Sequence, residues 1–469
     1  MMTNNPYANR QPTHFQGVYF NETLINKYNQ QGPRYTSYPT ALEFSPIDDG
    51  CEADILTHQD PSTPLSLYLH IPFCRHLCYY CGCNKIITKK NSDAGDYLDY
   101  LFAEIRHKKS LLTGSPIVKQ LHLGGGTPTF LSDDELARLW DFLHTEFHFA
   151  QEGDFSIEID PRELRPTTLQ VLRNLGFNRL SFGVQDLNHQ VQIAVNRVQS
   201  LDLITQVMQT AQELGFSSTN IDLIYGLPHQ SVESMTATLQ AIIKLSPARL
   251  SVFNYAHLPA RFAAQKRICE STLPTATEKL AMFNTIITLL NQAGYQYIGI
   301  DHFAKPDDTL AVAQRDGKLH RNFQGYTILG ECDLLGFGVS AISQIGNHML
   351  QNPTSLDEYC SMINQGKLPA VKYIASSPTD DMHRYVIMNL LCHDYVDFAQ
   401  LRVRFGIEPM VYFAKQLETL HDMAADGLLT IDEQGIHILP AGRILGRNIA
   451  MVFDAYLDKK HAGRFSKVI

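Results

Sequence analysis

The sequence predicts an α/β fold in which parallel strands alternate with helices, with an N-terminal arm before it and a small, mainly helical domain after it. Apolar runs of strand length alternate with amphipathic helical stretches from residue 65 onward, and this alternation ends near residue 375. Repeated strand–helix alternation produces parallel strands joined by right-handed crossovers. The pattern leaves open whether the strands form a barrel or an open doubly wound sheet.

Three regions follow from these changes of pattern. Residues 1–64 are polar and loop-like, with the turn-rich stretch GPRYTSYPTALEF and no sustained periodicity, and we expect them to form the arm. Residues 65–374 hold the strand–helix alternation, and residues 375–469 form the helical domain. A chain of 469 residues is long enough for two or three domains.

Seven strands are expected between the arm and the helical domain. Each is a short apolar run bounded by turn residues. They cover 65–72, 118–124, 155–160, 179–185, 218–226, 249–255 and 295–301. A barrel and an open sheet would both place the chemistry in the loops beyond the carboxyl ends of these strands.

Helices are expected where apolar residues recur at helical spacing. A second signal marks a helix that begins at Ser132, because Glu135 three residues later completes a capping box. One helix carries an apolar face of Tyr97, Leu98, Leu101, Phe102 and Ile105. The last region should contain helices at 380–393, 397–404, 409–426 and 442–459, with a short hairpin, LLTIDEQGIHIL, before the final helix.

The charge balance excludes some classes of partner. The formal net charge is -9, so there is no basic excess to bind nucleic acid phosphates or anionic lipid. No apolar run approaches the roughly 20 residues that span a bilayer, and the first residues, MMTNNPYANRQPTHFQG, lack the apolar core of a secretory signal. We therefore expect a cytoplasmic protein with no nucleic acid partner and no membrane span.

Cysteine usage indicates metal binding rather than disulfides. The chain has nine cysteines, an odd number, and four of them fall between residues 74 and 83. Clustering of this kind is only weak evidence alone, because free cysteines are often small buried apolar residues.

The clustered cysteines form C-x3-C-x2-C within HIPFCRHLCYYCGCNK, directly after the first expected strand. Three thiolates on one loop can ligate three corners of a four-iron cluster and leave the fourth iron open to a small molecule. A structural zinc site is the alternative, but such sites usually have two separated ligand pairs and are closed by four ligands. Cys83 could complete a closed site, although a single glycine separates it from Cys81, which is a tight spacing for two ligands of one metal.

This segment resembles the fingerprint of the radical S-adenosylmethionine (SAM) superfamily, in which the loop follows the first strand of a strand–helix series. The resemblance implies a 4Fe-4S cluster held by Cys74, Cys78 and Cys81, whose open iron binds the amino and carboxylate groups of SAM. Electron transfer into the sulfonium would then release a 5'-deoxyadenosyl radical. Tyr80, the aromatic residue between the second and third cysteines, fits the same pattern.

The second expected strand ends in a glycine-rich loop, LGGGTPTFL. Three consecutive glycines allow the backbone to approach a ligand and to present its peptide groups to it. A tight strand-to-helix turn is the alternative explanation. The loop resembles the superfamily motif that holds the amino group of SAM, although GGGTP replaces the usual GGE.

Polar residues stand where the later strands should end, at Glu158 and Asp160, Gln185, Asp222 and 254–256. A carboxylate in an apolar strand such as FSIEID needs a ligand or a buried partner, because burying it unpaired is costly. A structural ion pair would also satisfy it. Arg197 could bind a ligand carboxylate through bidentate hydrogen bonds, and a surface salt bridge is the alternative.

Matching segments now extend over nearly the whole chain. They are GPRYTSYPTALEF, SLYLHIPFCRHLCYYCGCNK, LGGGTPTFL, EIDPREL, NRLSFGVQD, STNIDLIYGLPHQ, RLSVFNYAHLP, DHFAKPDD, HRNFQGYT, LLGFGVSAIS and the ending RFSKVI. Together they resemble the oxygen-independent coproporphyrinogen III oxidases of haem biosynthesis, also called coproporphyrinogen dehydrogenases. The resemblance implies an incomplete (βα)6-type barrel as the catalytic domain, with an N-terminal arm and a mainly helical C-terminal domain.

The resemblance also implies the reaction. Two propionate side chains of coproporphyrinogen III would be oxidatively decarboxylated to vinyl groups, giving protoporphyrinogen IX. The radical would remove a hydrogen from the propionate β carbon, an unidentified acceptor would take an electron, and carbon dioxide would leave. An electron donor would have to reduce the cluster, and the family likeness suggests a monomer.

By motif position, the resemblance assigns contacts to two SAM molecules. The first would contact Tyr68, Gly125, Glu158 and Ile342. The second would contact Tyr80, Gly126, Thr127, Gln185, Arg197, Asp222 and Ala256. Packing of Tyr68 in the core is an alternative to its role as a contact.

Three other groups are candidates without an assigned role. The resemblance implies that His70 and Cys83 lie beside the cluster loop, and both are candidate substrate-side or proton-handling groups. The HRNFQGYT segment, with His320 and Arg321, either closes over the site or is a turn-rich surface loop.

Two other functions fit parts of the sequence. A haem chaperone relative shares the barrel and the cysteine loop, but Cys83, the GPRYTSYP segment and Arg197 in its VNR context favour the oxidase. A structural zinc protein would contain zinc and neither iron nor sulfide.

Overall fold

The computed structural model describes residues 17–457. The first 16 residues of the expected arm, the RFSKVI ending and the last two residues of the expected 442–459 helix lie outside the described residues. Backbone contacts divide the chain into two compact units. The larger unit contains residues 42–274 and 331–375, and the smaller unit contains the residues up to 41, 275–330 and those from 376 onward.

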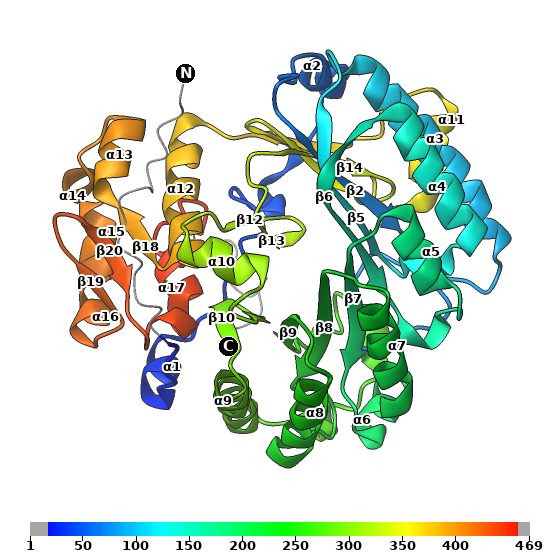
Figure 1. The fold of residues 1–469 in the computed structure, drawn as a ribbon. Helices are drawn as coiled ribbons and strands as arrows, with labels where there is room; N and C mark the ends of the chain where they lie inside the picture. Colours follow the sequence, from blue (N-terminus) through cyan, green and yellow to red (C-terminus); the bar gives the residue numbers. More distant parts are fainter. Residues whose placement is uncertain (1–16, 458–469) are drawn as a thin grey trace. The chain divides into compact units, whose positions relative to one another are not determined.

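The larger unit is built on one sheet with the strand order β1-β17-β16-β15-β14-β2-β5-β6-β7-β8-β9. The strands from β14 to β9 are all parallel, and helices cover their outer side (Figure 1). Because the order is linear rather than closed, the expected α/β fold with an incomplete barrel is confirmed. The parallel strands are β2 (Leu65–Ile71), β5 (Ile117–Gly125), β6 (His148–Ile159), β7 (Arg179–Gln185), β8 (Ser218–Tyr225), β9 (Arg249–Asn254) and β14 (Asp333–Phe337).

The helices between these strands have the expected amphipathic pattern. Helix α4 (Asp133–Glu146) begins with the capping box of Ser132 and Glu135. Helix α3 (Ser92–Leu111) buries the five residues of its expected apolar face, Tyr97, Leu98, Leu101, Phe102 and Ile105. The series continues with α5 (Thr168–Leu175), α6 (His189–Ala194), α7 (Leu201–Glu213) and α8 (Val232–Leu245), and short 3-10 helices η2 (Pro128–Phe130), η3 (Pro161–Glu163), η4 (Ala263–Arg267) and η5 (Glu270–Thr272) lie in the connections.

The sheet extends beyond the expected strands on the far side of β2. The sequence pattern does not predict β14, because its segment DLLGF is short and is followed by a glycine-containing turn. The remaining strands of this side pair in antiparallel fashion. They are β15 (Ile342–Ile345), β16 (His348–Gln351), β17 (Lys372–Ala375) and β1 (Ser45–Pro46), and α11 (Leu356–Asn364) connects β16 to β17.

The expectation that residues 1–64 are loop-like is wrong for two segments. Helix α1 (Glu22–Tyr28) is capped by Asn21, whose side chain accepts the peptide N–H of Leu24 at 3.1 Å. Helix α2 (Cys51–Thr57) follows η1 (Ala41–Glu43). Each α-helix has 7 residues, which is two turns, so neither is long enough to produce a visible period in the sequence.

The seventh expected strand belongs to the smaller unit and does not pair as a parallel crossover strand. Strand β10 (Gln296–Gly299) pairs in antiparallel fashion with β11 (His302–Ala304), because a turn at 300–301 joins the two directly. The neighbouring elements are α9 (Ala276–Gln292), α10 (Thr309–Arg315) and the hairpin of β12 (His320–Asn322) and β13 (Gly325–Thr327).

The C-terminal part of the smaller unit is mainly helical, as expected. Its core includes Leu390, Phe398, Leu420, Ile436 and Ile449. The 409–426 stretch is divided into three short helices rather than one. The elements are α12 (Pro378–His393), β18 (Tyr395–Asp397), α13 (Phe398–Phe405), α14 (Pro409–Tyr412), α15 (Ala414–Thr419), α16 (His421–Ala425), β19 (Leu429–Ile431), β20 (Gly435–Ile438), η6 (Arg443–Leu445) and α17 (Gly446–Met451).

The final helix ends earlier than expected, at Met451. Beyond it, the Asp454 carboxylate accepts the peptide N–H of Tyr456 at 2.9 Å and the hydroxyl of Tyr35 at 2.8 Å. Side-chain hydrogen bonds of this kind compete with helix formation, which explains the early end.

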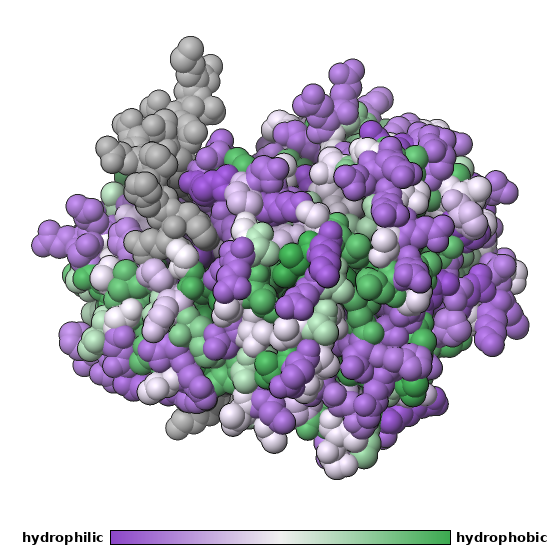
Figure 2. Space-filling model, turned by 60° about the horizontal axis from the view of Figure 1, so that its bottom comes forward, coloured by the Kyte–Doolittle hydropathy of each residue, from purple (hydrophilic) through white to green (hydrophobic). Residues whose placement is uncertain are grey.

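The surface carries both hydrophilic and hydrophobic residues. Hydrophilic residues cover most of the face shown in Figure 2, with hydrophobic residues between them. Within residues 17–457, no helix is both long and apolar enough to cross a membrane.

Candidate active site

The three cysteines of the C-x3-C-x2-C segment lie on one loop after β2. Cys74 ends the short strand β3 (Phe73–Cys74), which pairs in parallel with β4 (Ile86–Ile87). The peptide N–H of Thr88 donates to the carbonyl of Cys74 at 3.0 Å, and that of Tyr79 donates to the carbonyl of Val195 at 3.0 Å. The loop is therefore held at its start and at its middle.

The thiols of this loop have different surroundings. Cys74 lies with its Sγ 3.4 Å from the Thr127 hydroxyl oxygen, and burial raises its pKa to about 11. Cys78 is buried, and guanidinium N–H groups of Arg162 and Arg197 each donate to its sulfur at 3.5 Å. Since a cysteine binds metal as a thiolate, these two cationic donors are aimed at the atom that would carry the negative charge.

The donor set fits a cluster with three protein ligands. Burial, followed by the charges of Cys81 and Cys78, raises the pKa of Cys74, so the three thiols influence one another electrostatically. Among residues 17–457, no three Cys, His, Asp or Glu side chains already stand in metal-binding geometry.

Cys83 interacts with the loop without belonging to the three-cysteine pattern. Its thiol donates a hydrogen bond to the sulfur of Cys81, which lowers the pKa of Cys81 and raises that of Cys83 well above its ordinary value. The ammonium of Lys85 donates to the carbonyl of Cys81 at 3.0 Å. The expected substrate-side or proton-handling role of Cys83 stays a prediction.

The glycine loop lies directly beside the cysteine loop. The peptide N–H of Gly126 donates to the carbonyl of Ile71 at 2.8 Å, and that of Thr127 donates to the carbonyl of Phe73 at 2.9 Å. A Cβ at Gly126 would lie 2.6 Å from the carbonyl oxygen of Pro72, so only glycine fits there. The close packing of the two loops therefore requires Gly126 even without a ligand.

Gly125 and Glu158 meet across two neighbouring strand ends. Gly125 has a φ of +114°, which favours glycine, and its peptide N–H donates to Glu158 Oε2 at 3.1 Å. The side chain of Glu158 is 44% exposed, so its second oxygen can be reached by a ligand. The structure thus brings together two residues that the sequence assigned to the same site.

His122 is a residue of this site that the sequence analysis did not single out. Its Nε2 lies 3.5 Å from Glu158 Oε1, and its Nδ1 lies 2.7 Å from the Ser156 hydroxyl. Burial opposes ionisation of Glu158, but the hydrogen bond and charge of His122 keep the pKa of Glu158 below its ordinary value. The only signal in the sequence is a histidine in the apolar segment VKQLHLG, two residues before the glycine loop.

Tyr68 and His70 form a hydrogen-bonded pair on β2. The Tyr68 hydroxyl lies 2.9 Å from His70 Nδ1, and His70 Nε2 lies 2.9 Å from the carbonyl oxygen of Asn84. Burial lowers the pKa of His70, which favours the neutral ring. In a neutral ring Nε2 must donate to the carbonyl, so Nδ1 accepts from Tyr68. Tyr68 is only half-buried, so it is not a simple core aromatic.

Asp160 and Arg197 belong to a buried group of charges. Asp160 Oδ2 lies 2.6 Å from Arg162 Nη2 and 3.1 Å from Arg197 Nη1. Arg197 also donates to the carbonyl of Gly183, and it is buried rather than part of a surface salt bridge. Its Nε has no hydrogen-bond acceptor among the described residues. A structural ion pair therefore explains Asp160, while Arg197 keeps one donor for another partner.

Gln185 and Asp222 lie on the adjacent strands β7 and β8. Gln185 has a φ of +69°, where the pairing of the two strands shifts register. The Asp222 carboxylate accepts from the Asn220 amide at 2.8 Å and from the Ser181 hydroxyl at 3.3 Å. Burial raises the pKa of Asp222 to about 6. Asp222 can therefore either donate or accept a hydrogen bond near neutral pH.

Two further expected contacts are linked through one glutamine. The side-chain amide of Gln265 donates to the carbonyl of Tyr80 at 3.2 Å and to that of Ala256 at 3.3 Å. This contact joins the cysteine loop to the segment after β9. Ile342 begins β15, and its backbone lies against Gly336 of β14, which is paired with Tyr68.

The HRNFQGYT segment forms the β12–β13 hairpin of the smaller unit. The guanidinium of Arg321 lies over the ring of Tyr326, with 4.7 Å to the ring centroid. The expectation that His320 and Arg321 close over the site stays a prediction.

The fold and the cysteine loop together define the class of this protein as radical SAM. A family model described as the radical SAM superfamily matches residues 68–242, and one described as the HemN C-terminal domain matches residues 376–445. The solved structure of coproporphyrinogen III oxidase (HemN) from Escherichia coli, described as a radical SAM enzyme, superimposes with a TM-score of 0.90 at 48% identity, covering 94% of this chain and 100% of that one.

Curated relatives give the particular family. Oxygen-independent coproporphyrinogen III oxidase from Salmonella typhimurium is 50% identical over 457 residues, which is 97% of this chain and 99% of the relative. The protein of the same name from Escherichia coli K12 is 50% identical over 456 residues, with the same coverage. The chain belongs to the oxygen-independent coproporphyrinogen III oxidase family.

Proposed function

We propose that this chain converts coproporphyrinogen III to protoporphyrinogen IX without oxygen, by oxidative decarboxylation of two propionate side chains to vinyl groups. Similarity to the oxidases over almost the full length supports this activity. The observation that carries it is the hydrogen bond between Gly125 and Glu158 next to the cysteine loop. This bond joins two of the proposed SAM contacts, on a glycine loop whose next residues, Gly126 and Thr127, donate to the carbonyls of Ile71 and Phe73.

Cys74, Cys78 and Cys81 are proposed to hold three irons of a 4Fe-4S cluster, with the fourth left for SAM. When bound, the cluster and SAM would supply a 5'-deoxyadenosyl radical that takes a hydrogen atom from the propionate β carbon. The chain itself binds and orients these groups. Arg162 and Arg197 stabilise negative charge on Cys78 through their hydrogen bonds to its sulfur.

The first SAM is proposed to contact Tyr68, Gly125, Glu158 and Ile342. These residues lie on or beside β2, β5, β6 and β15 of one sheet. His122 keeps the pKa of Glu158 low, so the carboxylate of this 44% exposed side chain can accept further hydrogen bonds from the ammonium group of SAM.

A second SAM is proposed beside the first. Arg197 has a donor for its carboxylate, and Asp222 can adapt to a donor or an acceptor because its pKa lies at about 6. The proposed contacts are Tyr80, Gly126, Thr127, Gln185, Arg197, Asp222 and Ala256.

His70 and Cys83 are proposed as proton-handling groups on the substrate side. The neutral ring of His70 carries its proton on Nε2, which donates to the carbonyl of Asn84, and the side chain of Cys83 interacts with that of Cys81 in the cysteine loop. We also propose that the chain works as a cytoplasmic monomer, with one protein donating an electron to the cluster and a separate acceptor taking the electron released from the substrate.

Anaerobic incubation of the reconstituted enzyme with coproporphyrinogen III, SAM and dithionite tests the activity. Chromatography should resolve a product with two vinyl groups. The haem chaperone relative is the second candidate, and the names of the curated relatives support the oxidase instead. Stable haem binding with no vinyl product would contradict the oxidase function and support the haem chaperone function.

A further inference from the structure

A run of cationic residues borders the cysteine loop. Arg75, Lys85, Lys89 and Lys90 fall between residues 75 and 90, where the chain has no Asp or Glu, although its net charge is -9. Lys89 and Lys90 are exposed, and neither ammonium pairs with an acidic residue of the described chain. We call Arg75, Ile87, Lys89 and Lys90 the basic strip.

The basic strip lies one hydrogen bond away from a proposed cluster ligand. In the β3–β4 pair, Ile87 is the register partner of Cys74, and the Ile87 side chain is 43% exposed. The next residue, Thr88, donates its peptide N–H to the carbonyl of Cys74 at 3.0 Å. An electron that enters at this surface therefore has a short route through bonds to the cysteine.

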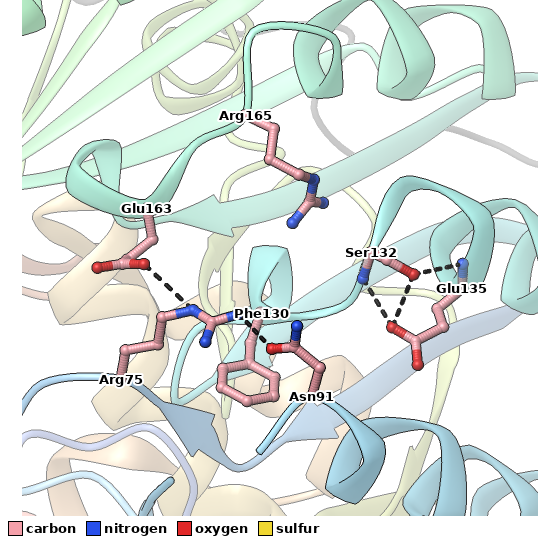
Figure 3. A pocket seen from close by; sticks show the side chains of 7 residues that line it. All are labelled: Arg75, Asn91, Phe130, Ser132, Glu135, Glu163 and Arg165. Atoms are coloured by element: carbon pink, nitrogen blue, oxygen red, sulfur yellow. Dashed lines mark hydrogen bonds and ion pairs between the residues drawn. The ribbon is translucent and has the colours of Figure 1, made fainter. Parts of the chain in front are cut away.

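A pocket of about 410 Å³ adjoins the strip (Figure 3). Arg75 extends across it: its guanidinium donates to Asn91 Oδ1 at 2.5 Å, pairs with Glu163 at 3.2 Å and lies 4.7 Å from the centroid of the Phe130 ring. These three contacts fix Arg75, which is adjacent to Cys74 in the chain.

The acidic residues of this pocket already have partners. Glu163 pairs with both Arg75 and His76, the latter at 2.8 Å, and Glu135 accepts the peptide N–H and the hydroxyl of Ser132. Next to the lysines, Asp93 accepts the hydroxyl of Thr88 at 2.7 Å, and no ion pair joins it to Lys89 or Lys90 among the described residues. The ammonium groups of these two lysines are therefore the exposed cations of this surface that have no acidic partner in the described chain. A partner of negative charge is the one that fits.

We propose that the basic strip is the docking surface for a small acidic flavoprotein that delivers one electron to the cluster. The proposal rests on the proposed function, since only a cluster at Cys74, Cys78 and Cys81 needs this electron. One electron leaves the reduced flavin and enters the cluster, and no atom is transferred. The lysines attract an acidic partner, and exposed Ile87 suits the apolar edge of a flavin ring.

Such a complex should be weak and sensitive to salt, because electron-transfer interfaces are small and exposed charges are screened. The test uses the reconstituted full-length enzyme and an acidic flavodoxin as the partner. The variant is Lys89→Glu with Lys90→Glu. The control is Lys244→Glu with Lys415→Glu, which makes the same charge change at two exposed lysines far from the loop in the sequence.

At low ionic strength the Lys89/Lys90 variant should raise the Kd for flavodoxin about tenfold, and the control should change it less than about twofold. Stopped-flow reduction by flavodoxin should slow in the same variant, while turnover driven by dithionite should equal that of the wild type. Cross-links between the partners should map to residues near Lys89 and Lys90.

Equal Kd values for the two variants, or cross-links only to other surfaces, would overturn this docking surface. Such results would leave turnover with dithionite unaffected. A wild-type enzyme that forms no vinyl product even with dithionite would instead count against the proposed function, so the two failures can be told apart.

Discussion

The ring of His122 stacks on the ring of Tyr68, with centroids 5.9 Å apart and planes at 19°. The two residues are register partners on β5 and β2. Because His122 also contacts Glu158, it links two residues proposed to bind SAM, Tyr68 on β2 and Glu158 on β6, which are the strands on either side of β5. His122 is thus a positioning residue, which acts through Glu158 and Tyr68.

Replacing His122 with Ala should raise the KM for SAM about tenfold, the effect of losing one hydrogen bond to a charged group. The pKa of Glu158 should rise, because His122 lowers it in the native protein. As the pH is lowered, Glu158 becomes protonated and SAM affinity falls. This loss of affinity should begin at a higher pH in the variant than in the wild type. The pH profile of KM measures this change, and exposed His148→Ala serves as the control. Unchanged profiles in both variants would remove His122 from the site.

Replacing Cys74, Cys78 or Cys81 with Ala should abolish the electron paramagnetic resonance signal of the reduced cluster. Each cysteine is expected to hold one iron, and its loss opens a second corner. Cys83→Ala should keep both iron content and signal, because Cys83 lies outside the C-x3-C-x2-C pattern. A full signal in any of the first three variants would exclude that cysteine as a ligand.

Gly126→Ala should destabilise the protein and weaken SAM binding together. The new Cβ would lie 2.6 Å from the Pro72 carbonyl, and such overpacking costs about 1–3 kcal/mol. Thermal unfolding and calorimetric titration with SAM measure the two effects. Gly95→Ala in α3 is the matched control, because its nearest neighbour is the flexible end of Glu135 at 3.4 Å. If Gly126→Ala changed neither the stability nor the affinity for SAM, the two loops would not pack as described.

Asp222→Asn should change how stability depends on pH. Burial raises the pKa of Asp222 in the folded protein to about 6, above its value in the unfolded chain. The contribution of this group to the free energy of unfolding is therefore fully present below the unfolded-state pKa of Asp222, and it is lost as the pH rises through about 6. Asn does not ionise, so the variant should gain about 1 kcal/mol relative to the wild type between pH 5 and pH 7.5. Urea unfolding at the two values measures the difference. A constant difference would mean that Asp222 titrates normally.

Much of the fold could be predicted because the parallel strands are continuous apolar runs. Strand β7 has the bounds expected from RLSFGVQ, and α4 begins at its capping box. The sequence could not predict the pairing of β14 with β2, since two segments more than 250 residues apart carry no local sign that they are neighbours. Helices α1 and α2 could not be predicted because a helix of two turns is too short to show a helical period of apolar residues.

Some residues of the candidate site could likewise be predicted from the sequence, and others could not. Cys74, Gly125 and Glu158 could be found because each breaks an apolar pattern or belongs to a motif. His122 could not, since a single histidine in a strand acquires its meaning only from Tyr68 and Glu158 on the neighbouring strands. Similarly, the ion pair of Asp160 with Arg162 and Arg197 depends on a loop geometry that no spacing predicts.

The most direct test of the central claim follows one hydrogen atom. Coproporphyrinogen III deuterated at the propionate β carbons would be incubated anaerobically with the enzyme, SAM and dithionite, and the 5'-deoxyadenosine would be analysed by mass spectrometry. We expect deuterium in 5'-deoxyadenosine together with a vinyl product. Unlabelled 5'-deoxyadenosine alongside full conversion to the vinyl product would contradict hydrogen abstraction at this position.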